Sequence, residues 1–339
     1  MKFSVGTNER PHIFGRVIVG LLLLFIVIGL TGRAVNAATS SGGASGLSIS
    51  PLRQELTLKP GQAGKIDITL KNITGGPIVA KAAVQDFESD NVSGNPKLIT
   101  NPDANNPVSI RNFLIGLGNI PMTTGQQTTF SIPVQVPANA SPGAYYGLVE
   151  YQAIPGNSAT AGGNNIVALS AAVGQLVFIT VPGNVSERLQ INKIHIYQDN
   201  KASKEGLFFT SVPKQVGIEL HNFGNSFAKP FGTVTLQNSQ GKTIYSYQLN
   251  GGITRSLMLP NSSRIYLNQI KNIKSPGRYT IVANVSYGKG SSILIGKKTF
   301  WYIQTWVLIL VIVILIALVV LALLARRRYK RATNRHQRR

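Results

Sequence analysis

The side chains best suited to metal chemistry lie in one short stretch. Asp86, Glu88 and Asp90 alternate, which places three carboxylates on one face of a predicted strand, and oxygen ligands of this kind suit calcium. The calcium-loop pattern fails, however, because Asn91 stands where glycine is needed and Lys97 where a bidentate glutamate is needed. We therefore expect a solvated strand end that leads into a hairpin, and no metal site.

Nucleophile, zinc and phosphate chemistry have less support. His195 and His221 each fall within a predicted strand, and neither has the spacing of a zinc motif. The stretch 290–298 resembles a phosphate-binding loop only superficially, since five residues separate its glycines and Lys298 stands where a magnesium-binding hydroxyl belongs. The chain has no cysteine, which excludes disulfides, thiolate metal sites and cysteine nucleophiles. We expect no catalytic residue and no cofactor.

The charge is strongly basic and unevenly distributed. The 339 residues include 34 Lys and Arg against 12 Asp and Glu, a formal charge of +22. Residues 38–185 are balanced, with seven basic and seven acidic side chains, whereas 186–305 carry fifteen and four. Such an excess attracts anionic polymers or lipid headgroups. The candidate residues for this patch are Lys271, Lys274, Arg278, Lys289, Lys297 and Lys298.

The first 37 residues have the pattern of a secretory signal peptide. Basic residues precede a fourteen-residue uncharged stretch at 17–30, and small side chains at Val35 and Ala37 indicate cleavage before Ala38. Fourteen residues are fewer than the ~20 that a membrane-spanning helix requires. An uncleaved anchor is the alternative.

A second apolar stretch predicts a membrane helix. The twenty residues from Trp306 to Ala325 contain no charge, glycine or proline, which matches a hydrocarbon core of ~30 Å. We place the helix with its aromatic belt at 300–325 and the basic tail at 326–339, which begins with Arg326, Arg327 and Arg328. The positive-inside rule predicts a single-pass, type I protein with a cytoplasmic tail in the cell membrane. A stop-transfer role explains the basic tail without nucleic acid.

Between these segments the pattern is that of an all-β protein. Ile66, Ile68 and Leu70 alternate with polar residues, and no segment before 300 has the pattern of a capped amphipathic helix. Strands are predicted at 65–71, 78–87, 126–136, 145–153 and 166–181. Short strands separated by Gly, Pro and Asn turns are typical of antiparallel sandwiches.

An internal repeat divides this β region into two. An Ile-x-Leu-x-Asn run ends at Asn72 and again at Asn222, and a Ser-Pro-Gly-x-Tyr run ends at Tyr145 and again at Tyr279. We therefore expect two tandem Ig-like antiparallel β-sandwich domains and one C-terminal transmembrane helix. The predicted domains are a flexible leader at 38–46, a first sandwich at 47–184 and a basic second sandwich at 185–299.

The repeated tyrosine has two interpretations. Proline and glycine shape the turn, and the tyrosine that follows can bury its ring while its hydroxyl bonds to the backbone. The same ring can also serve as a platform on which a ligand stacks. The structural role is the commoner one at such corners.

The organisation resembles that of the bacterial WxL-interacting surface proteins. The motifs that carry the resemblance are Leu58–Gly61, Ser141–Gly147 and Leu259–Ser263, the last followed by Gly277-Arg-Tyr279. The resemblance implies a peptidoglycan-binding sandwich, a second sandwich that binds a host or partner protein, and one membrane helix. It implies no individual binding residue.

We therefore expect a non-catalytic, membrane-anchored envelope protein. Its predicted partners are cell-wall polymer (peptidoglycan or an anionic glycan), a surface protein, or both, together with membrane lipid at the helix. The alternative is a chaperone-like assembly factor that accepts a client strand at an exposed sheet edge. The candidate edge for this alternative is Leu47–Ser50.

Overall fold

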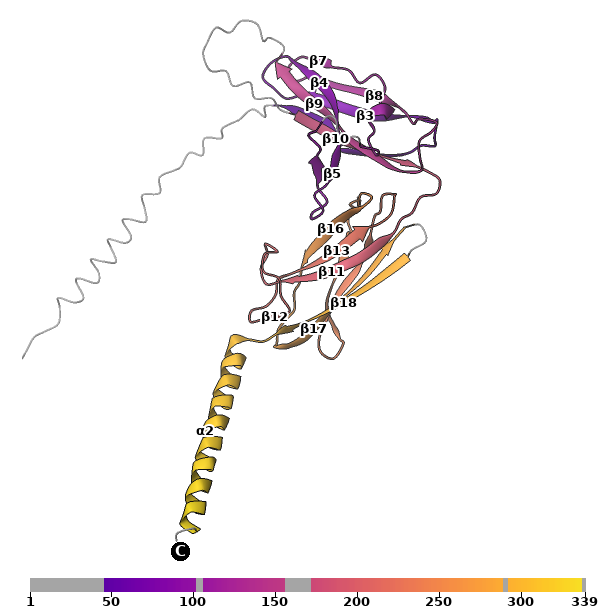
Figure 1. Ribbon diagram of the computed structural model, residues 1–339. Helices are drawn as coiled ribbons and strands as arrows, with labels where there is room; N and C mark the ends of the chain where they lie inside the picture. Colours follow the sequence, from indigo (N-terminus) through magenta and orange to yellow (C-terminus); the bar gives the residue numbers. More distant parts are fainter. Residues whose placement is uncertain (1–45, 102–105, 156–171, 289–291, 337–339) are drawn as a thin grey trace, which may run out of the picture. The chain divides into compact units, whose positions relative to one another are not determined.

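The computed structural model describes residues 46–101, 106–155, 172–288 and 292–336, with side chains as far as Arg326. The predicted signal peptide and nearly all of the leader lie outside the described residues, as does the predicted beginning of the strand at 166–181. Figure 1 labels the strands and the one long helix.

The first sandwich is formed by ten strands and one short turn of 3-10 helix at Arg111–Phe113. The strands are β1 (Leu47–Ser50), β2 (Arg53–Thr57), β3 (Ala63–Asn72), β4 (Ile78–Gln85), β5 (Phe87–Ser89), β6 (Pro96–Leu98), β7 (Ile120–Met122), β8 (Gln127–Gln135), β9 (Gly143–Pro155) and β10 (Ala172–Val181). One sheet has the order β1-β3-β8 and the other β2-β10-β9-β4-β7, and β5 and β6 form a separate hairpin.

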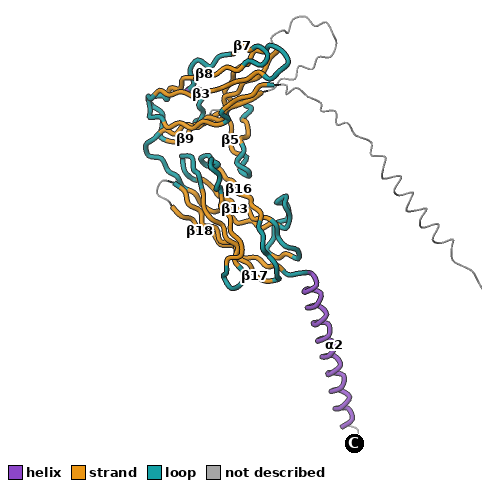
Figure 2. Tube along the Cα trace, turned by 180° about the vertical axis from the view of Figure 1, so that it is seen from behind, coloured by secondary structure: helices purple, strands orange, loops and turns teal. Residues whose placement is uncertain are grey.

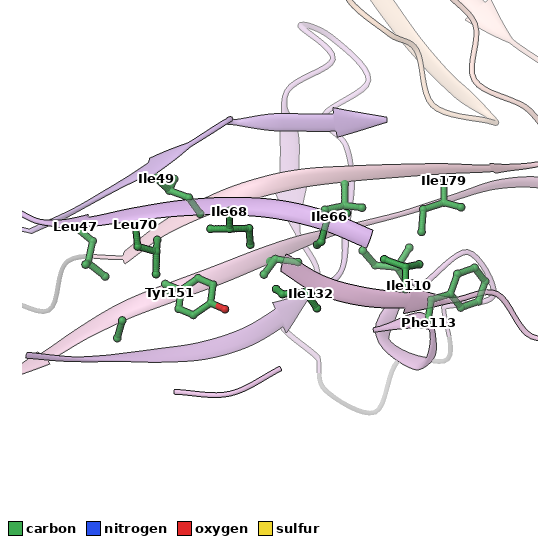
Figure 3. Packing of buried hydrophobic residues seen from close by; sticks show 14 of the residues in the cluster. Leu47, Ile49, Ile66, Ile68, Leu70, Ile110, Phe113, Ile132, Tyr151 and Ile179 are labelled. Carbon is green, nitrogen blue, oxygen red and sulfur yellow. The ribbon is translucent and has the colours of Figure 1, made fainter. Parts of the chain in front are cut away.

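The core of this sandwich lies between the two sheets. The predicted alternation on β3 is confirmed, because Ile66, Ile68 and Leu70 are fully buried. They pack with Ile179 from β10 and Tyr151 from β9, as Figure 3 shows. Burial of one inward-facing row from each sheet is what fixes the register of the strands.

The second sandwich repeats this plan with eight strands. They are β11 (Leu189–Tyr197), β12 (Phe208–Phe209), β13 (Gln215–Asn222), β14 (Phe231–Gln237), β15 (Thr243–Leu249), β16 (Ser262–Gln269), β17 (Gly277–Tyr287) and β18 (Ser292–Tyr302). The sheets have the orders β11-β13-β16 and β12-β18-β17-β14-β15. In both sandwiches, the first two strands belong to opposite sheets and the last two are antiparallel neighbours. The predicted all-β, Ig-like sandwich class is confirmed.

A buried asparagine closes the same corner in each sandwich. Asn72 is fully buried, donates to Gly76 O and Thr123 O (2.9 Å each), and accepts from Thr74 N–H (2.9 Å). Asn222 forms the equivalent bonds at the end of β13. Its partners in the second sandwich are Ser226 O (2.9 Å), Leu259 O (3.0 Å) and Gly224 N–H (3.0 Å).

The repeated tyrosine takes the structural role. The hydroxyl of Tyr145 donates to Ser141 O (3.0 Å), and that of Tyr279 donates to Ser275 O (2.6 Å). The ring of Tyr279 is buried and lies against Phe300. The hydroxyl therefore ties the start of β17 to the turn before it.

Helix α2 (Thr305–His336) follows β18 after two residues, and Figure 2 shows it in purple after the orange strands. Its segment Thr305–Arg326 is long and apolar enough to cross a membrane. One boundary needs correction, because the strand continues to Tyr302, beyond the predicted end of the sandwich at 299. The helical backbone continues past the apolar segment as far as His336. Tyr302 is buried in the sandwich, so it does not belong to an aromatic belt.

We predict that Asn222→Ala lowers the free energy of unfolding of the full chain by roughly 2–4 kcal/mol. The change leaves two carbonyls and one N–H without their partner in a buried corner, and such groups cannot recover water. Urea unfolding in detergent micelles measures the effect. Asn284→Ala, at an exposed position of β17, is the control and should change the value by less than about 0.5 kcal/mol. Equal effects of both substitutions would contradict the structural role of Asn222.

Candidate functional site

An open sheet edge is a ready site for another chain, because its N–H and C=O groups lack partners. Most edges among the described residues carry a feature that discourages pairing. β1, the edge predicted from the sequence, is only four residues long, and β7 has three residues, one of them Pro121. β8 contains Pro133, whose carbonyl already accepts from Ile115 N–H (3.0 Å).

The remaining edges are interrupted, partly covered or polar. A bulge separates Ile191 from Lys193 in β11. On β16, Ile265 N–H donates to Val92 O (2.7 Å). β2 is five residues long and carries the charged pair Arg53 and Glu55, and none of the large apolar side chains of β15 is exposed.

β18 lacks these features along most of its length. It is eleven residues long, and its inner neighbour β17 pairs with every residue from Ser292 to Tyr302 without a register shift. On the other side, β12 pairs only with Trp301 and Tyr302. Among the described residues, no strand forms ladder hydrogen bonds with the outer edge of 292–300, which spans roughly 30 Å at ~3.4 Å per residue. β11 of the facing sheet packs against β18 near Gly296.

The register shows which backbone groups point outward. Trp301 N–H donates to Leu207 O (2.7 Å), away from β17. Because bonding direction alternates along an antiparallel strand, the N–H and C=O groups of Ile293, Ile295, Lys297 and Thr299 also point away from β17. These four residues offer a row of donors and acceptors to an incoming strand.

The side chains of the same residues form an apolar and basic stripe on the outer face. Ile293 and Ile295 are 63% and 66% exposed, and Lys297 is exposed beside them. β17 and β18 together contain three cations and no acidic residue. The chemistry of this edge therefore suits an extended segment with apolar and acidic side chains.

The equivalent edge of the first sandwich is covered over half of its strand. There, β2 pairs with β10 in parallel over five residues, from Leu176 to Thr180. The short β12 gives only two pairs in the second sandwich. The outer edge of the last strand is therefore unpaired over a longer stretch in the second sandwich than in the first.

An ionic cluster holds the segment that precedes β12. His195 on β11 is largely buried, with its Nδ1 3.0 Å from Glu205 Oε2 and its Nε2 2.8 Å from Glu219 Oε2. A carboxylate only accepts, so both bonds form together when the imidazole carries both protons. Lys193 Nζ lies 3.1 Å from Glu205 Oε1.

These contacts change the acidity of Glu205. Burial works to raise the pKa of its carboxyl, but the hydrogen bonds and charges of His195 and Lys193 outweigh burial and hold the pKa below its ordinary value of 4.5. Because Glu205 lies in the segment 198–207, the cluster ties that segment to β11. The segment leads directly into β12, which sets where the open edge of β18 ends.

The predicted basic patch does not form one surface. Lys271, Lys274 and Arg278 lie together near the start of β17. Lys297 and Lys298 lie farther along β18 and point to opposite faces of the sheet, because successive strand residues alternate. The sixth residue of the predicted patch, Lys289, lies outside the described residues. Adjacency in the sequence was the wrong guide for the two neighbouring lysines.

The three carboxylates singled out in the sequence have separate partners. Asp86 is buried and accepts from Arg111 Nε (3.0 Å), whereas Glu88 is exposed and pairs with Lys97 (2.9 Å). Asp90 accepts from the backbone of the hairpin turn. Residues 292–302, which include most of the stretch that resembles a phosphate loop, form a strand and not a loop that leads into a helix.

No family model and no curated protein sequence matches the chain. Among solved structures, it is similar to the class 5 fimbriae chaperone CfaA (TM-score 0.37, 12% identity, covering 76% of this chain and 99% of that chain). It is also similar to the E. coli chaperone DraB (TM-score 0.33, 12% identity, 76% and 96%). A protein of unknown function from Porphyromonas gingivalis is a third (TM-score 0.29, 12% identity, 75% and 98%). These likenesses concern the fold, and the resemblance to WxL-interacting proteins stays a prediction.

The open edge was not found from the sequence, although it left a signal. Ile293, Leu294 and Ile295 are consecutive apolar residues in a strand, where alternation places at least one of them toward solvent. The sequence does not show which neighbour covers that strand, because pairing depends on distant residues.

We predict that the stabilising effect of Glu205 depends on pH. Its carboxyl has a lowered pKa in the folded chain, so its ionised form contributes stability above its ordinary pKa, and the contribution disappears as pH falls through the lowered value. Glu205→Gln should therefore be less stable than the wild type at neutral pH, with a difference that shrinks as the pH falls below the ordinary pKa of 4.5. Thermal unfolding of the full chain across this range measures it. A difference that stays constant would contradict the role of the ionised group.

Proposed function

We propose that the chain is a membrane-anchored binding protein that accepts an extended segment of a protein partner along the outer edge of β18. The observation that carries the proposal is the unpaired edge at 292–300, with Ile293 and Ile295 exposed beside it. Backbone pairing would supply affinity, and the flanking side chains would supply selectivity. This corresponds to the chaperone-like alternative, with the acceptor edge on β18 in place of Leu47–Ser50.

Charge selects the kind of partner. Lys297 faces outward beside the two isoleucines, and no acidic residue on β17 or β18 offsets it. An incoming strand with apolar residues next to Ile293 and Ile295 and an acidic residue next to Lys297 complements this surface. The proposed occupant is therefore an extended segment of another protein that carries two apolar residues and one acidic residue on the same face.

Helix α2 supports the anchoring part of the proposal. Its apolar segment is followed by Arg326 and the basic tail, which favours a cytoplasmic tail and an extracytoplasmic pair of sandwiches. Binding of cell-wall glycan stays a prediction of the sequence, because the contacts described for β18 concern a peptide backbone.

We predict that the full chain in detergent micelles binds a labelled nine-residue extended peptide in which alternate residues form one face. On that face, Val stands at the two positions next to Ile293 and Ile295 and Glu at the position next to Lys297, and Thr fills the intervening positions. Methylation of two peptide nitrogens that face β18 should weaken binding about tenfold or more, because two backbone hydrogen bonds of ~1 kcal/mol each are lost. Fluorescence polarisation measures both affinities. A peptide with Lys in place of Glu is the charge control and should bind more weakly. Equal affinity of the methylated and unmethylated peptides would contradict edge pairing.

The matching protein variant is Ile295→Pro. The N–H of this residue points away from β17, so proline removes an outward donor without removing a bond of the existing ladder. We expect peptide binding to fall at least tenfold while the thermal unfolding of the chain stays cooperative. Ile295→Val keeps the donor and a similar side chain, and it should bind the peptide as the wild type does. Loss of binding in both variants would indicate that the backbone donor is not what matters.

A further inference from the structure

The end of the second sandwich that leads into α2 lies very close to the start of that helix. Ile303 N–H still donates to Phe209 O (2.9 Å), and the helix begins at Thr305. Three residue steps separate Tyr302 from Thr305, and an extended chain covers at most about 11 Å in three steps. The polar headgroup layer on one side of a bilayer is roughly 5–8 Å thick. If α2 spans the membrane, this end of the sandwich must therefore lie at or next to the headgroups.

A row of side chains on this end is unusual for a surface in water. Phe208, Trp301 and Arg278 are cross-strand neighbours on β12, β18 and β17. All three point to the outer face, because the next residues along the strands, Phe209 and Tyr302, are buried. Phe208 is 74% exposed and Trp301 is 42% exposed. Two large aromatic rings next to an arginine match the composition of a membrane–water interface.

The loops at the same end are strongly basic. They are the segments that join β11 to β12, β12 to β13, β14 to β15, and β16 to β17. These segments share one end of the sandwich because the strands that they join end or begin at paired positions near Gln215, Gln269 and Tyr302. Their exposed cations are Lys201, Lys204, Lys214, Lys242, Lys271 and Lys274, and Arg278 at the start of β17 adds a seventh at this end. The acidic residues in these segments are Asp199 and Glu205. Glu205 is already paired with Lys193 and His195.

We propose that this end of the second sandwich is a lipid-binding surface that rests on anionic headgroups, with Phe208 and Trp301 inserted at the interface and the surrounding cations bound to phosphates. The inference rests on the proposed anchoring by α2 but not on strand binding at β18. A bilayer is the occupant that fits, because the helix joined to the sandwich brings it to this surface. Aromatic rings favour the interface, and clustered lysines attract anionic lipid.

The chain has only two tryptophans, which allows each to be followed alone. In the full chain with Trp306→Phe, Trp301 is the single reporter of the sandwich end. In the full chain with Trp301→Phe, Trp306 is the single reporter of the helix. Each variant is reconstituted into vesicles of phosphatidylcholine and phosphatidylglycerol whose acyl chains carry bromine near the headgroup, and tryptophan quenching is measured.

We expect both reporters to be quenched, and the quenching of Trp301 to increase with the fraction of phosphatidylglycerol. Quenching of Trp306 without quenching of Trp301 would overturn the inference while leaving the anchor intact. Absence of quenching at Trp306 would instead overturn the anchor, and with it the premise. Equal quenching of Trp301 in vesicles of phosphatidylcholine alone would overturn the requirement for anionic lipid.

Variants separate the contribution of the aromatic rings from that of the cations. In the Trp301 reporter chain, Phe208→Ser should reduce quenching. Ile253→Ser is the control and should not reduce it, because Ile253 is an exposed apolar residue in the loop after β15, at the opposite end of the sandwich.

Replacing Lys271, Lys274 and Arg278 by Gln should at least halve the gain in quenching that phosphatidylglycerol gives. The matched control replaces the exposed Lys65, Lys71 and Lys81 of the first sandwich by Gln and should leave that gain unchanged. Equal effects of the two triple variants would overturn the assignment of the cations.

Discussion

Every β-sandwich must satisfy or shield the backbone groups at the edges of its sheets. A strand inside a sheet has partners on both sides, whereas an edge strand leaves every second N–H and C=O to solvent. In the described parts of this chain, proline, a bulge, short length or a neighbouring segment limits most edges. The outer edge of β18 at 292–300 is long, regular and flanked by exposed isoleucines. The proposed partner site depends on this open edge.

The internal repeat explains how such an edge can exist while the core of the sandwich stays intact. Asn72 and Asn222 close the same corner with the same set of bonds, and Tyr145 and Tyr279 fasten the same turn. These contacts hold the strands on either side of each core. The strands that pair with the outer edge of the last strand, β2 beside β10 and β12 beside β18, take no part in these contacts. Such a strand can therefore be long in one copy and short in the other, without a change in the core.

Much of the fold was predictable because apolar and polar residues alternate locally along the sequence of a half-buried strand. The alternation at 65–71 and the paired motifs are enough to indicate two sandwiches, and the apolar stretch from Trp306 predicts the helix. The open edge was not predictable, because a strand does not show in its own residues which distant segment will pair with it. The basic patch stays a prediction, and the structure describes only where its residues lie. Lys271, Lys274 and Arg278 share one end of the sandwich, whereas the neighbouring Lys297 and Lys298 are separated by the pleat.

Residue-resolved amide hydrogen exchange of the full chain in micelles would probe the open edge most directly. An open edge predicts alternation along β18, with slow exchange at Leu294 and Gly296, which are bonded to β17, and fast exchange at Ile295 and Lys297, which point outward. Uniformly slow exchange at all four amides would mean that something already covers the edge. That result would contradict a free acceptor strand.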